Sequence, residues 1–416
     1  MDDLLYLVHR IPWPPNKGDK IRSHHILRYL ARHYRVHLGT FIDDPADAVY
    51  LPELKKLCTS VCARPLPRRR AQLRALTGFF TGEPLTVPWY RDRELARWVR
   101  ATLIRQPVAH AVAFSSAMAQ YLPEGSGRTR VVDFVDVDSD KWTQYAPTRR
   151  WPMSAVYRRE GRRLLAYERQ VAQASNASLF VSPAEAEAFR ERAPEVAGRV
   201  HALNNGVDAG RFSPDAVAGL DPYPDGVRAI VFSGAMDYWP NVDAVVWFAD
   251  HVLPALRAEH PDVEFCIVGS RPAPEVAALA ARPGVTVTGF VDDVRPWIAH
   301  ATVAVAPLRI ARGVQNKVLE AMALGRPVVA SPQALEGLTA RIGSEVIQAE
   351  AEPRAFLEAV SGYLRAPDPA LGHAARARVL ADYDWARNLS YLGEILRRRP
   401  GPAPGAEPTV EAAHGR

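Results

Sequence analysis

Short apolar runs alternate with longer stretches of helical period along most of this 416-residue chain. Runs that are apolar throughout are typical of strands buried on both faces of a parallel sheet, with helices as the crossovers. The alternation therefore predicts an α/β protein. The strands that we expect are residues 4–8, 36–42, 108–114, 131–135 and 178–181, and in a second series residues 229–233, 263–268, 285–288, 303–306 and 327–330.

A stretch rich in Pro, Gly and Asp, residues 205–226, has no hydrophobic period and separates the two series of strands. It predicts a connection between two domains. Each series is long enough for one doubly wound sheet, whose ligands bind beyond the carboxyl ends of the strands. We expect an N-terminal domain of residues 1–210, a C-terminal domain of residues 211–381, a closing helix over 382–398 and a disordered tail from 399 to 416.

Composition and the N-terminus exclude several classes of protein. No run approaches the about 18 to 20 apolar residues that span a bilayer, and the acidic start is unlike a signal peptide, so we expect a cytoplasmic protein. Cys58, Cys62 and Cys266 are too few for a disulfide framework or a four-ligand zinc site, and we expect them in the core. The excess of 52 basic over 46 acidic residues is mild, and with no recognisable nucleic-acid module it does not predict nucleic-acid binding.

One segment in the C-terminal half predicts an anion site. Gly313 allows a tight turn after a strand, and a helix follows over residues 315–324. The start of this helix offers unpaired N–H groups, and Arg312 and Lys317 add positive charge, which together suit a diphosphate. Glu320 lies one turn deeper, where a carboxylate can accept hydrogen bonds from ribose hydroxyls. The alternative is an ordinary surface Lys-Glu pair on a crossover helix.

Residues 320–329, Glu-Ala-Met-Ala-Leu-Gly-Arg-Pro-Val-Val, resemble the donor-site signature of family 4 glycosyltransferases. This resemblance covers nearly the whole ordered chain. It implies the GT-B fold, in which two Rossmann-like domains face a central cleft and the terminal helix returns to the first domain. It also implies sugar transfer with retention at the anomeric carbon. Two positions depart from the family: Arg312 stands where most members have a Glu that positions the sugar, and no Arg-Lys pair follows Gly234.

A narrower resemblance comes from residues 10–22, 133–142, 240–241 and 313–320. They are similar to the sugar transferases associated with bacterial exopolysaccharide and exosortase (PEP-CTERM) gene clusters. This branch implies a nucleotide diphosphate sugar as donor, a glycan or lipid-linked acceptor, and neither a cofactor nor a metal. The donor contacts that we expect are Gly234, Asn241, Gly289, Phe290, Val291, Gly313, Asn316, Lys317 and Glu320.

Several of these assignments have alternatives. At Gly289, Phe290 and Val291 GT-B proteins hold the nucleobase, but Phe290 is equally compatible with packing in the core. In the first loop, Lys17 and Gly18 suit donor phosphates or an acceptor sugar, and a plain surface turn fits the same residues.

A group of carboxylates follows the expected strand 131–135. Asp136 and Asp138 would orient acceptor hydroxyls or accept a proton there, and we count them with Lys317 and Arg312 as catalytic candidates. Two alternatives remain open: a divalent metal held by the two carboxylates, and capping of the next helix by Ser139 or Asp140.

The function also has alternatives. Residues 149–169 are rich in Arg and aromatic side chains, and with residues 64–74 they suit the inner face of a plasma membrane, although a solvated Arg-rich helix fits the same pattern. We expect a glycosyltransferase of the hexosyltransferase type. A nucleotide-sugar 2-epimerase of the same architecture, and a non-catalytic binder of sugar nucleotides or membranes, are the rival hypotheses.

Overall fold

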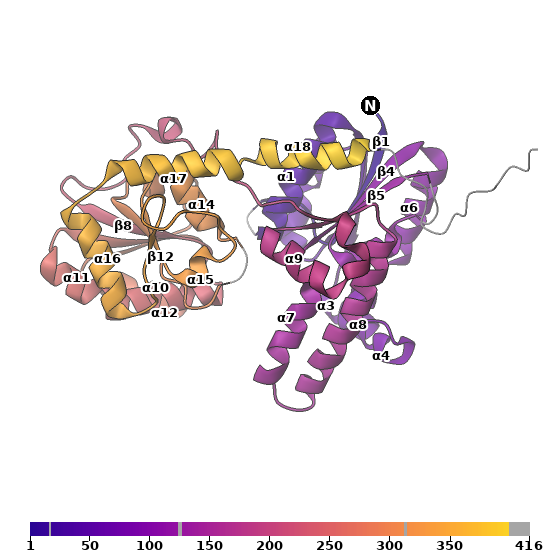
Figure 1. Cartoon of the computed structure of the whole chain (residues 1–416), viewed down its shortest axis with the longest axis horizontal. Helices are drawn as coiled ribbons and strands as arrows, with labels where there is room; N and C mark the ends of the chain where they lie inside the picture. Colours follow the sequence, from indigo (N-terminus) through magenta and orange to yellow (C-terminus); the bar gives the residue numbers. More distant parts are fainter. Residues whose placement is uncertain (16–17, 124–126, 312–313, 399–416) are drawn as a thin grey trace, which may run out of the picture. The chain divides into compact units, whose positions relative to one another are not determined.

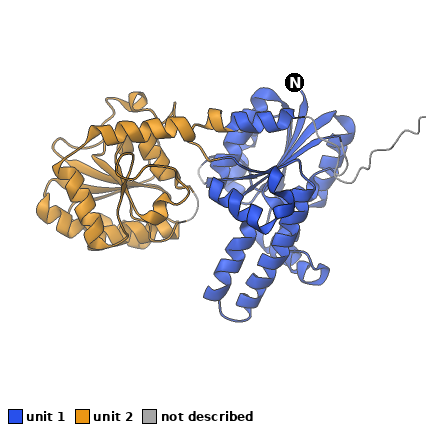
Figure 2. Cartoon of the chain, viewed as in Figure 1, with its two compact units in different colours: residues 1–203, 389–416 blue, residues 204–388 orange. Residues whose placement is uncertain are grey.

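The computed structural model describes residues 1–15, 18–123, 127–311 and 314–398, and it divides into two compact units (Figure 2). One unit comprises Met1–Leu203 with Leu389–Arg416, and the other Asn204–Asn388. Each unit has a parallel sheet with helices on its faces (Figure 1), so the predicted α/β class is confirmed. The expected tail from 399 to 416 lies outside the described residues.

The first unit has a seven-stranded sheet in the order β3-β2-β1-β4-β5-β6-β7, and all its neighbouring strands are parallel. The strands are β1 (Asp3–Val8), β2 (Arg35–Ile42), β3 (Ser60–Pro65), β4 (Val108–Phe114), β5 (Thr129–Val135), β6 (Ala177–Phe180) and β7 (Val200–Ala202). The α-helices are α1 (Gly18–His33), α2 (Leu51–Leu57), α3 (Arg68–Leu76), α4 (Gly78–Thr81), α5 (Thr86–Trp89), α6 (Arg93–Arg105), α7 (Asp138–Tyr145), α8 (Met153–Gln173) and α9 (Pro183–Arg192).

The second unit has a six-stranded parallel sheet in the order β10-β9-β8-β11-β12-β13. The strands are β8 (Arg228–Ser233), β9 (Val263–Val268), β10 (Val285–Gly289), β11 (Val303–Ala306), β12 (Val328–Ala330) and β13 (Ile347–Gln348). The main helices are α10 (Trp239–His251), α11 (Leu253–Glu259), α12 (Pro274–Ala278), α13 (Arg295–Ala299), α14 (Asn316–Ala323), α15 (Pro332–Leu335), α16 (Pro353–Arg365) and α17 (Pro369–Asp382). The last helix, α18 (Trp385–Arg397), contains the point at which the chain returns to the first unit.

Local sequence explains why these elements form where they do. Every residue of β1 is buried, as expected of a central strand that is apolar along its whole length. At the start of α9 the hydroxyl of Ser182 accepts from the backbone N–H of Glu185, and Pro183 occupies the first helical position, where no N–H is needed. Asp92 caps α6 in the same way, through the N–H of Leu95. Strands and caps of this kind can be recognised from the residues themselves.

Three strands lie outside the predicted set: β3, β7 and β13. The first is the half-buried edge of its sheet, and the other two are edge strands of three and two residues. A short or half-buried edge strand has no long apolar run, so the sequence gives little signal there. The sheet of the second unit therefore has six strands rather than the five expected.

Residues 205–226, the predicted connection between the domains, are packed backbone. They belong to the second unit, where Val207 bridges to Asp384 and donates its N–H to the backbone oxygen of Tyr383 (2.7 Å). Gly206 passes so close to Trp385 that an added Cβ would lie 2.8 Å from the indole ring. The segment has no hydrophobic period because its backbone is irregular. Hydrogen bonds to α17 and α18 satisfy its backbone groups in place of regular secondary structure.

None of the helices in the described ranges combines the length and the apolar character needed to span a lipid bilayer. The three cysteines are free thiols, two of them buried and Cys62 half-buried. Burial raises the pKa of the Cys58 thiol to about 12, and that of Cys266 likewise, so both remain protonated core residues.

Candidate functional site

Each sheet has one point at which the strand order reverses, and this is where an open α/β sheet binds its ligand. In the second unit the reversal lies between β8 and β11, so Gly234 and the start of α14 flank it. In the first unit it lies between β1 and β4, next to His9 and Arg10. The predicted donor segment therefore lies at the place in its sheet where a ligand is expected.

Two glycines allow the backbone after β8 and β9 to come into close contact. A Cβ on Gly269 would lie 1.7 Å from the backbone oxygen of Gly234, and one on Gly234 would lie 2.7 Å from Asn241 Nδ2. No side chain fits into distances this short. Gly234, which the sequence had singled out, is therefore required by the packing of this loop.

Lys317 lies in the first turn of α14 and is held by contacts from two other elements. Its Nζ donates to Asn241 Oδ1 (2.6 Å) and lies 4.9 Å from the centre of the Phe232 ring. Asn241 is itself 4% exposed and donates from Nδ2 to the backbone oxygen of Ala235 (2.9 Å). The ammonium group is thus fixed beside the loop that follows β8, on a part-buried side chain.

Glu320 lies one turn further along α14. Burial raises the pKa of Glu320 to about 7, against the opposing charges of Lys317 and Arg211. Burial also lowers the pKa of Lys317 to about 8, although Glu320 favours its charged form. Both groups therefore titrate close to neutrality, which is unusual for an ordinary surface Lys-Glu pair and typical of functional sites.

The start of α14 carries a further sign of a binding site. Asn316 is its first residue, and its Oδ1 is buried and finds no hydrogen-bond partner within the described ranges. Buried polar atoms are rarely left unpaired, so this acceptor suits a ligand hydroxyl group. Arg312 and Gly313, the two other predicted residues of this segment, lie outside the described residues.

The segment after β10 settles the alternative left open for Phe290. Its side chain is 74% exposed, so packing in the core is wrong for this residue. Gly289 has a φ of +68°, which turns the chain at the end of the strand, and Val291 packs against the core. An exposed ring held by a turn at the ligand-binding edge of the sheet is suited to stacking on a planar base.

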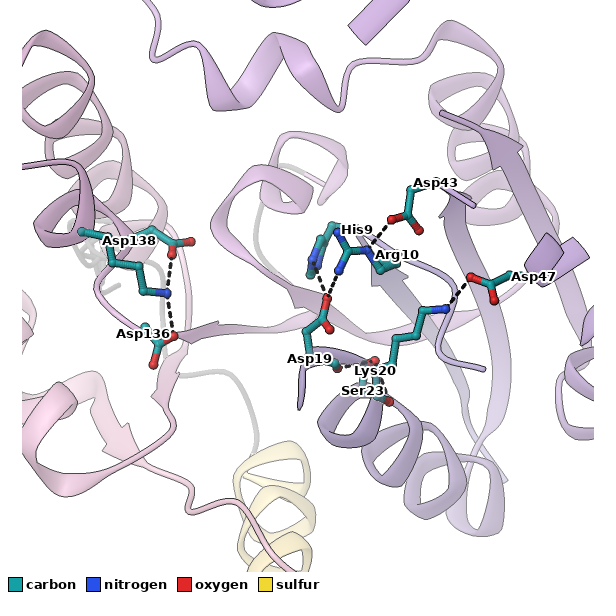
Figure 3. Close-up of polar contacts among 10 residues, drawn as sticks. His9, Arg10, Asp19, Lys20, Ser23, Asp43, Asp47, Asp136 and Asp138 are labelled. Carbon is teal, nitrogen blue, oxygen red and sulfur yellow. Dashed lines mark hydrogen bonds and ion pairs between the residues drawn. The ribbon is translucent and has the colours of Figure 1, made fainter. Parts of the chain in front are cut away.

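The first unit has a charged cluster at its own strand reversal (Figure 3). Arg10, two residues after β1, pairs with Asp19 of α1 (2.7 Å) and with Asp43, which directly follows β2 (2.8 Å). His9 Nε2 lies 3.5 Å from the same Asp19 carboxylate. Burial opposes ionisation of Asp19, but His9 and Arg10 outweigh it and hold the pKa of this carboxyl well below its usual range. Two carboxylates that share one guanidinium keep free lone pairs for sugar hydroxyls.

Other charged residues of this region have structural roles. Arg22 is fully buried and pairs through Nε and Nη2 with both oxygens of Asp133 (2.8 and 3.1 Å), tying α1 to β5. Lys20 pairs with Asp47 in the same buried layer. Gly18 begins α1, and a Cβ there would meet no atom, so the described fold does not require a glycine at this position. Lys17 lies outside the described residues.

Asp136 and Asp138 do lie together, but a lysine joins them. Lys141 donates from Nζ to Asp136 (2.6 Å) and to Asp138 (3.0 Å), and the two carboxylates raise the pKa of this lysine despite its burial (Figure 3). A carboxylate that already accepts a charged hydrogen bond is a poorer proton acceptor, which favours an orienting role over that of a base.

The capping alternative for Ser139 and Asp140 is wrong. The hydroxyl of Ser139 donates to Glu168 (2.6 Å), and Asp140 pairs with Arg192 (2.7 Å). Neither caps α7, because both lie inside the helix, and its N-cap residue Val137 forms no side-chain cap hydrogen bond. Within the described ranges no three His, Cys, Asp or Glu side chains are grouped as metal ligands are.

Backbone strain is concentrated at the same edges of the sheets. Among the described residues, three non-glycine residues have positive φ: Ser115 (79°), Val135 (71°) and Arg271 (53°). Each lies at or within three residues of the carboxyl end of a strand, namely β4, β5 and β9. Such conformations are costly, above all for a β-branched residue, and they occur mainly at functional sites. This strain is independent support for ligand binding at these edges.

The sequence analysis missed His9 and Asp43 in the first unit and Phe232 and Arg211 in the second. Asp43 directly follows a correctly predicted strand, so the rule that ligands bind after strands would have found it. Phe232 is a core strand residue, and only its contact with Lys317 shows its part in the site.

Comparison with known proteins agrees with this geometry. Residues 227–366 match the family described as "Glycosyl transferases group 1", so the second unit contains a glycosyltransferase group 1 domain. A phosphatidyl-myo-inositol mannosyltransferase from Propionibacterium freudenreichii subsp. shermanii is 31% identical over 148 residues. That match spans 32% of this chain and only 35% of the relative's length.

Two solved structures show the fold over almost the whole chain. The sucrose-phosphate synthase of Thermosynechococcus elongatus has a TM-score of 0.69 at 19% identity and covers 95% of this chain and 98% of its own. Anabaena Alr3699/HepE in complex with UDP has a TM-score of 0.65 at 15% identity and covers 95% and 99%. The chain therefore has the GT-B fold, as its sequence motifs predicted.

Proposed function

We propose that this protein is a retaining glycosyltransferase that moves a hexose from a nucleotide diphosphate donor to a glycan or lipid-linked acceptor. The observation that carries the proposal is the arrangement of Gly234, Asn241, Lys317 and Glu320 at the strand reversal of the second unit, inside the matched domain. Support for the donor class comes from HepE, a structural neighbour also solved with UDP-glucose. The acceptor of the mannosyltransferase relative, named as a phosphatidyl-myo-inositol, is consistent with a lipid-linked acceptor here.

The chemistry of the donor side follows from charge. When the bond between the sugar and the diphosphate breaks, negative charge develops on the departing phosphate. Lys317 and the first N–H groups of α14 lie ready to stabilise this charge, and they need no metal ion to do so. Glu320 would accept hydrogen bonds from the ribose, and Phe290 would stack on the base. Lys317 and the start of α14 would thus bind the diphosphate, and Glu320 and Phe290 would bind the nucleoside.

On the acceptor side we assign the hydroxyl-binding role to Asp19 and Asp43, together with Asp136 and Asp138. Arg10 and Lys141 hold these carboxylates in place. We further propose that transfer takes place in the cytoplasm, in exopolysaccharide synthesis and at the inner face of the plasma membrane, where a lipid-linked acceptor would lie.

Calorimetric titration with UDP and with other nucleoside diphosphates tests the donor site. Lys317→Ala and Glu320→Ala should each weaken binding at least tenfold, because a charged hydrogen bond is worth about 1.5 to 3 kcal/mol. Glu53 and Lys56 form an exposed pair of the same spacing on α2 (2.7 Å), so Glu53→Ala and Lys56→Ala are matched controls and should bind as the wild type does. Unchanged affinity in both site variants would refute the assignment.

Turnover separates the proposal from its rivals. A sugar transferase releases nucleoside diphosphate only when an acceptor is present, and the new linkage keeps the anomeric configuration of the donor, which NMR of the product reports. Inversion at C2 of a UDP-sugar without acceptor would identify an epimerase. Tight binding without turnover across an acceptor panel would identify a sensor or scaffold.

A further inference from the structure

The positive charge of this chain is concentrated in two stretches of the first unit. Residues 54–82 contain seven Lys or Arg and residues 141–159 contain five, and neither stretch contains an Asp or Glu. The rest of the chain then carries 40 basic against 46 acidic residues, so these two stretches account for the whole positive excess. Lys56, Arg64, Lys141 and Arg159 pair with acidic groups outside these stretches. The other eight basic residues leave a local positive charge that suits an anionic partner.

The second stretch forms the tip of a helical hairpin. Helices α7 and α8 lie side by side and extend away from the sheet of the first unit, with residues 146–152 as the turn between them (Figure 1). Apolar side chains are exposed at this tip: Trp151 is 82% exposed, Met153 47% and Tyr145 44%. A tryptophan at the end of a projecting hairpin contributes nothing to the core of the unit.

Basic groups surround this tryptophan. Arg149 and Arg150 precede Trp151, and Arg158 follows one to two turns into α8. All three arginines are exposed, and among the described residues none of them forms an ion pair with an acidic group. Arg149 lies over the ring of Tyr157 (5.7 Å). Exposed aromatic and unpaired basic side chains in this combination are typical of segments that enter the headgroup region of anionic bilayers.

The first stretch lies against the same hairpin. Arg159 of α8 lies over the ring of Phe79 (5.0 Å) and also donates to the backbone oxygen of Gly78. Glu160, fully buried, accepts from the backbone N–H groups of Leu85 (2.7 Å) and Thr86 (3.0 Å). These contacts hold residues 78–86 against α8, and α3 in turn packs on α4 and α5. Helices α3 and α4 carry a second set of exposed apolar and basic side chains: Arg68, Arg69, Arg70, Leu73, Leu76 and Phe80.

We infer that residues 145–158 and 68–80 form one membrane-docking surface for anionic phospholipid, with Trp151 and Phe80 inserted among the headgroups. Phe80 is 91% exposed, the highest value among the large apolar residues of the described chain. An anionic bilayer matches both features of the surface, because phosphate groups neutralise the arginines and the acyl boundary accepts the rings. The inference extends the proposed function by naming the partner that would present a lipid-linked acceptor.

Vesicle flotation tests the surface on the full-length protein. Wild-type protein should float with phosphatidylcholine vesicles that contain about 30% phosphatidylglycerol, and raised salt should release it. It should stay behind with pure phosphatidylcholine. Each basic group near an anionic surface contributes roughly fivefold to binding, so Arg149→Ser with Arg150→Ser should weaken it about 30-fold. Trp151→Ala should weaken vesicle binding as well, because the indole ring no longer enters the headgroup region.

Matched substitutions elsewhere serve as controls. Ile104 of α6 is 84% exposed and Arg354 of α16 is 90% exposed at its side chain, so Ile104→Ala and Arg354→Ala should float like the wild type. All variants should keep wild-type unfolding midpoints and wild-type affinity for UDP. Loss of vesicle binding with UDP affinity retained supports the docking surface whether or not sugar transfer is established.

Three results would overturn the inference. One is a wild-type protein that stays in solution with anionic vesicles at low salt, and another is equal flotation with neutral and anionic vesicles. The third is self-association in the absence of lipid that Trp151→Ala abolishes, measured by light scattering, because it would assign the surface to a second copy of the chain.

Discussion

The affinity for a nucleotide sugar should depend on pH as a bell-shaped curve. In the proposed donor site, Lys317 must be protonated to bind the diphosphate, and Glu320 must be ionised to accept hydrogen bonds from the ribose hydroxyls. Burial lowers the pKa of Lys317 to about 8, so its charge is present below pH 8 and lost above it. Burial raises the pKa of Glu320 to about 7, so its charge is lost below pH 7. The state with Lys317 protonated and Glu320 ionised, here called the competent pair, is therefore most populated between the two pKa values, near pH 7.5.

The size of the effect follows from the same two pKa values. At pH 7.5 about three quarters of each group is in the required state, so roughly 60% of molecules hold the competent pair. At pH 5.5 or 9.5 one of the two groups is in the required state in only about 3% of molecules. Affinity should therefore fall about 20-fold on either side, which is about 1.7 kcal/mol.

Calorimetry with UDP-glucose from pH 5.5 to 9.5 measures this curve. A nucleotide sugar is the proper ligand, because the terminal phosphate of free UDP titrates near pH 6 and would distort the acid limb. Glu320→Gln should abolish the acid limb and move the alkaline limb to lower pH, since the carboxylate supports the charge of Lys317. Lys317→Met should abolish the alkaline limb. An affinity that is flat over the whole range in the wild type would refute the assignment of this pair to the donor.

Three further predictions concern single side chains. Gly269→Ala should lower the free energy of unfolding, measured in urea, by about 3 kcal/mol or more, because its Cβ would lie 1.7 Å from a backbone oxygen. Gly362→Ala is the control: this residue lies in open space on α16, so the substitution should not destabilise the protein. Arg22→Met should lower the free energy of unfolding by about 3 to 5 kcal/mol, because the buried carboxylate that Arg22 pairs with is left uncompensated; a loss under 1 kcal/mol would contradict this. Phe290→Ala should weaken nucleotide-sugar binding about tenfold while stability in the same urea assay changes by less than about 0.5 kcal/mol, and a loss of stability would place the ring in the core after all.

The sequence by itself determined the class of fold and the position of helix α14. Strands β4, β9 and β11 lie at the predicted residues because a strand buried on both faces must be apolar along its length, and that property is local. The helix that carries Lys317 and Glu320 begins within one residue of its predicted start, since a tight turn and a helix start have their own residue preferences. The apolar strands and the start of α14 both depend on residues that are adjacent in the chain, so the sequence alone shows them.

Only the tertiary structure decided which charged side chains pair with one another. Arg22 and Asp133 are 111 residues apart, and the packing of α1 on the sheet brings them into one buried pair. Packing also brings Lys317 to Asn241, 76 residues apart, and Arg159 to Phe79. A charged residue gives the same signal in a sequence whether it binds a substrate or pairs with another residue of the protein. Its role depends on which side chains the fold places next to it.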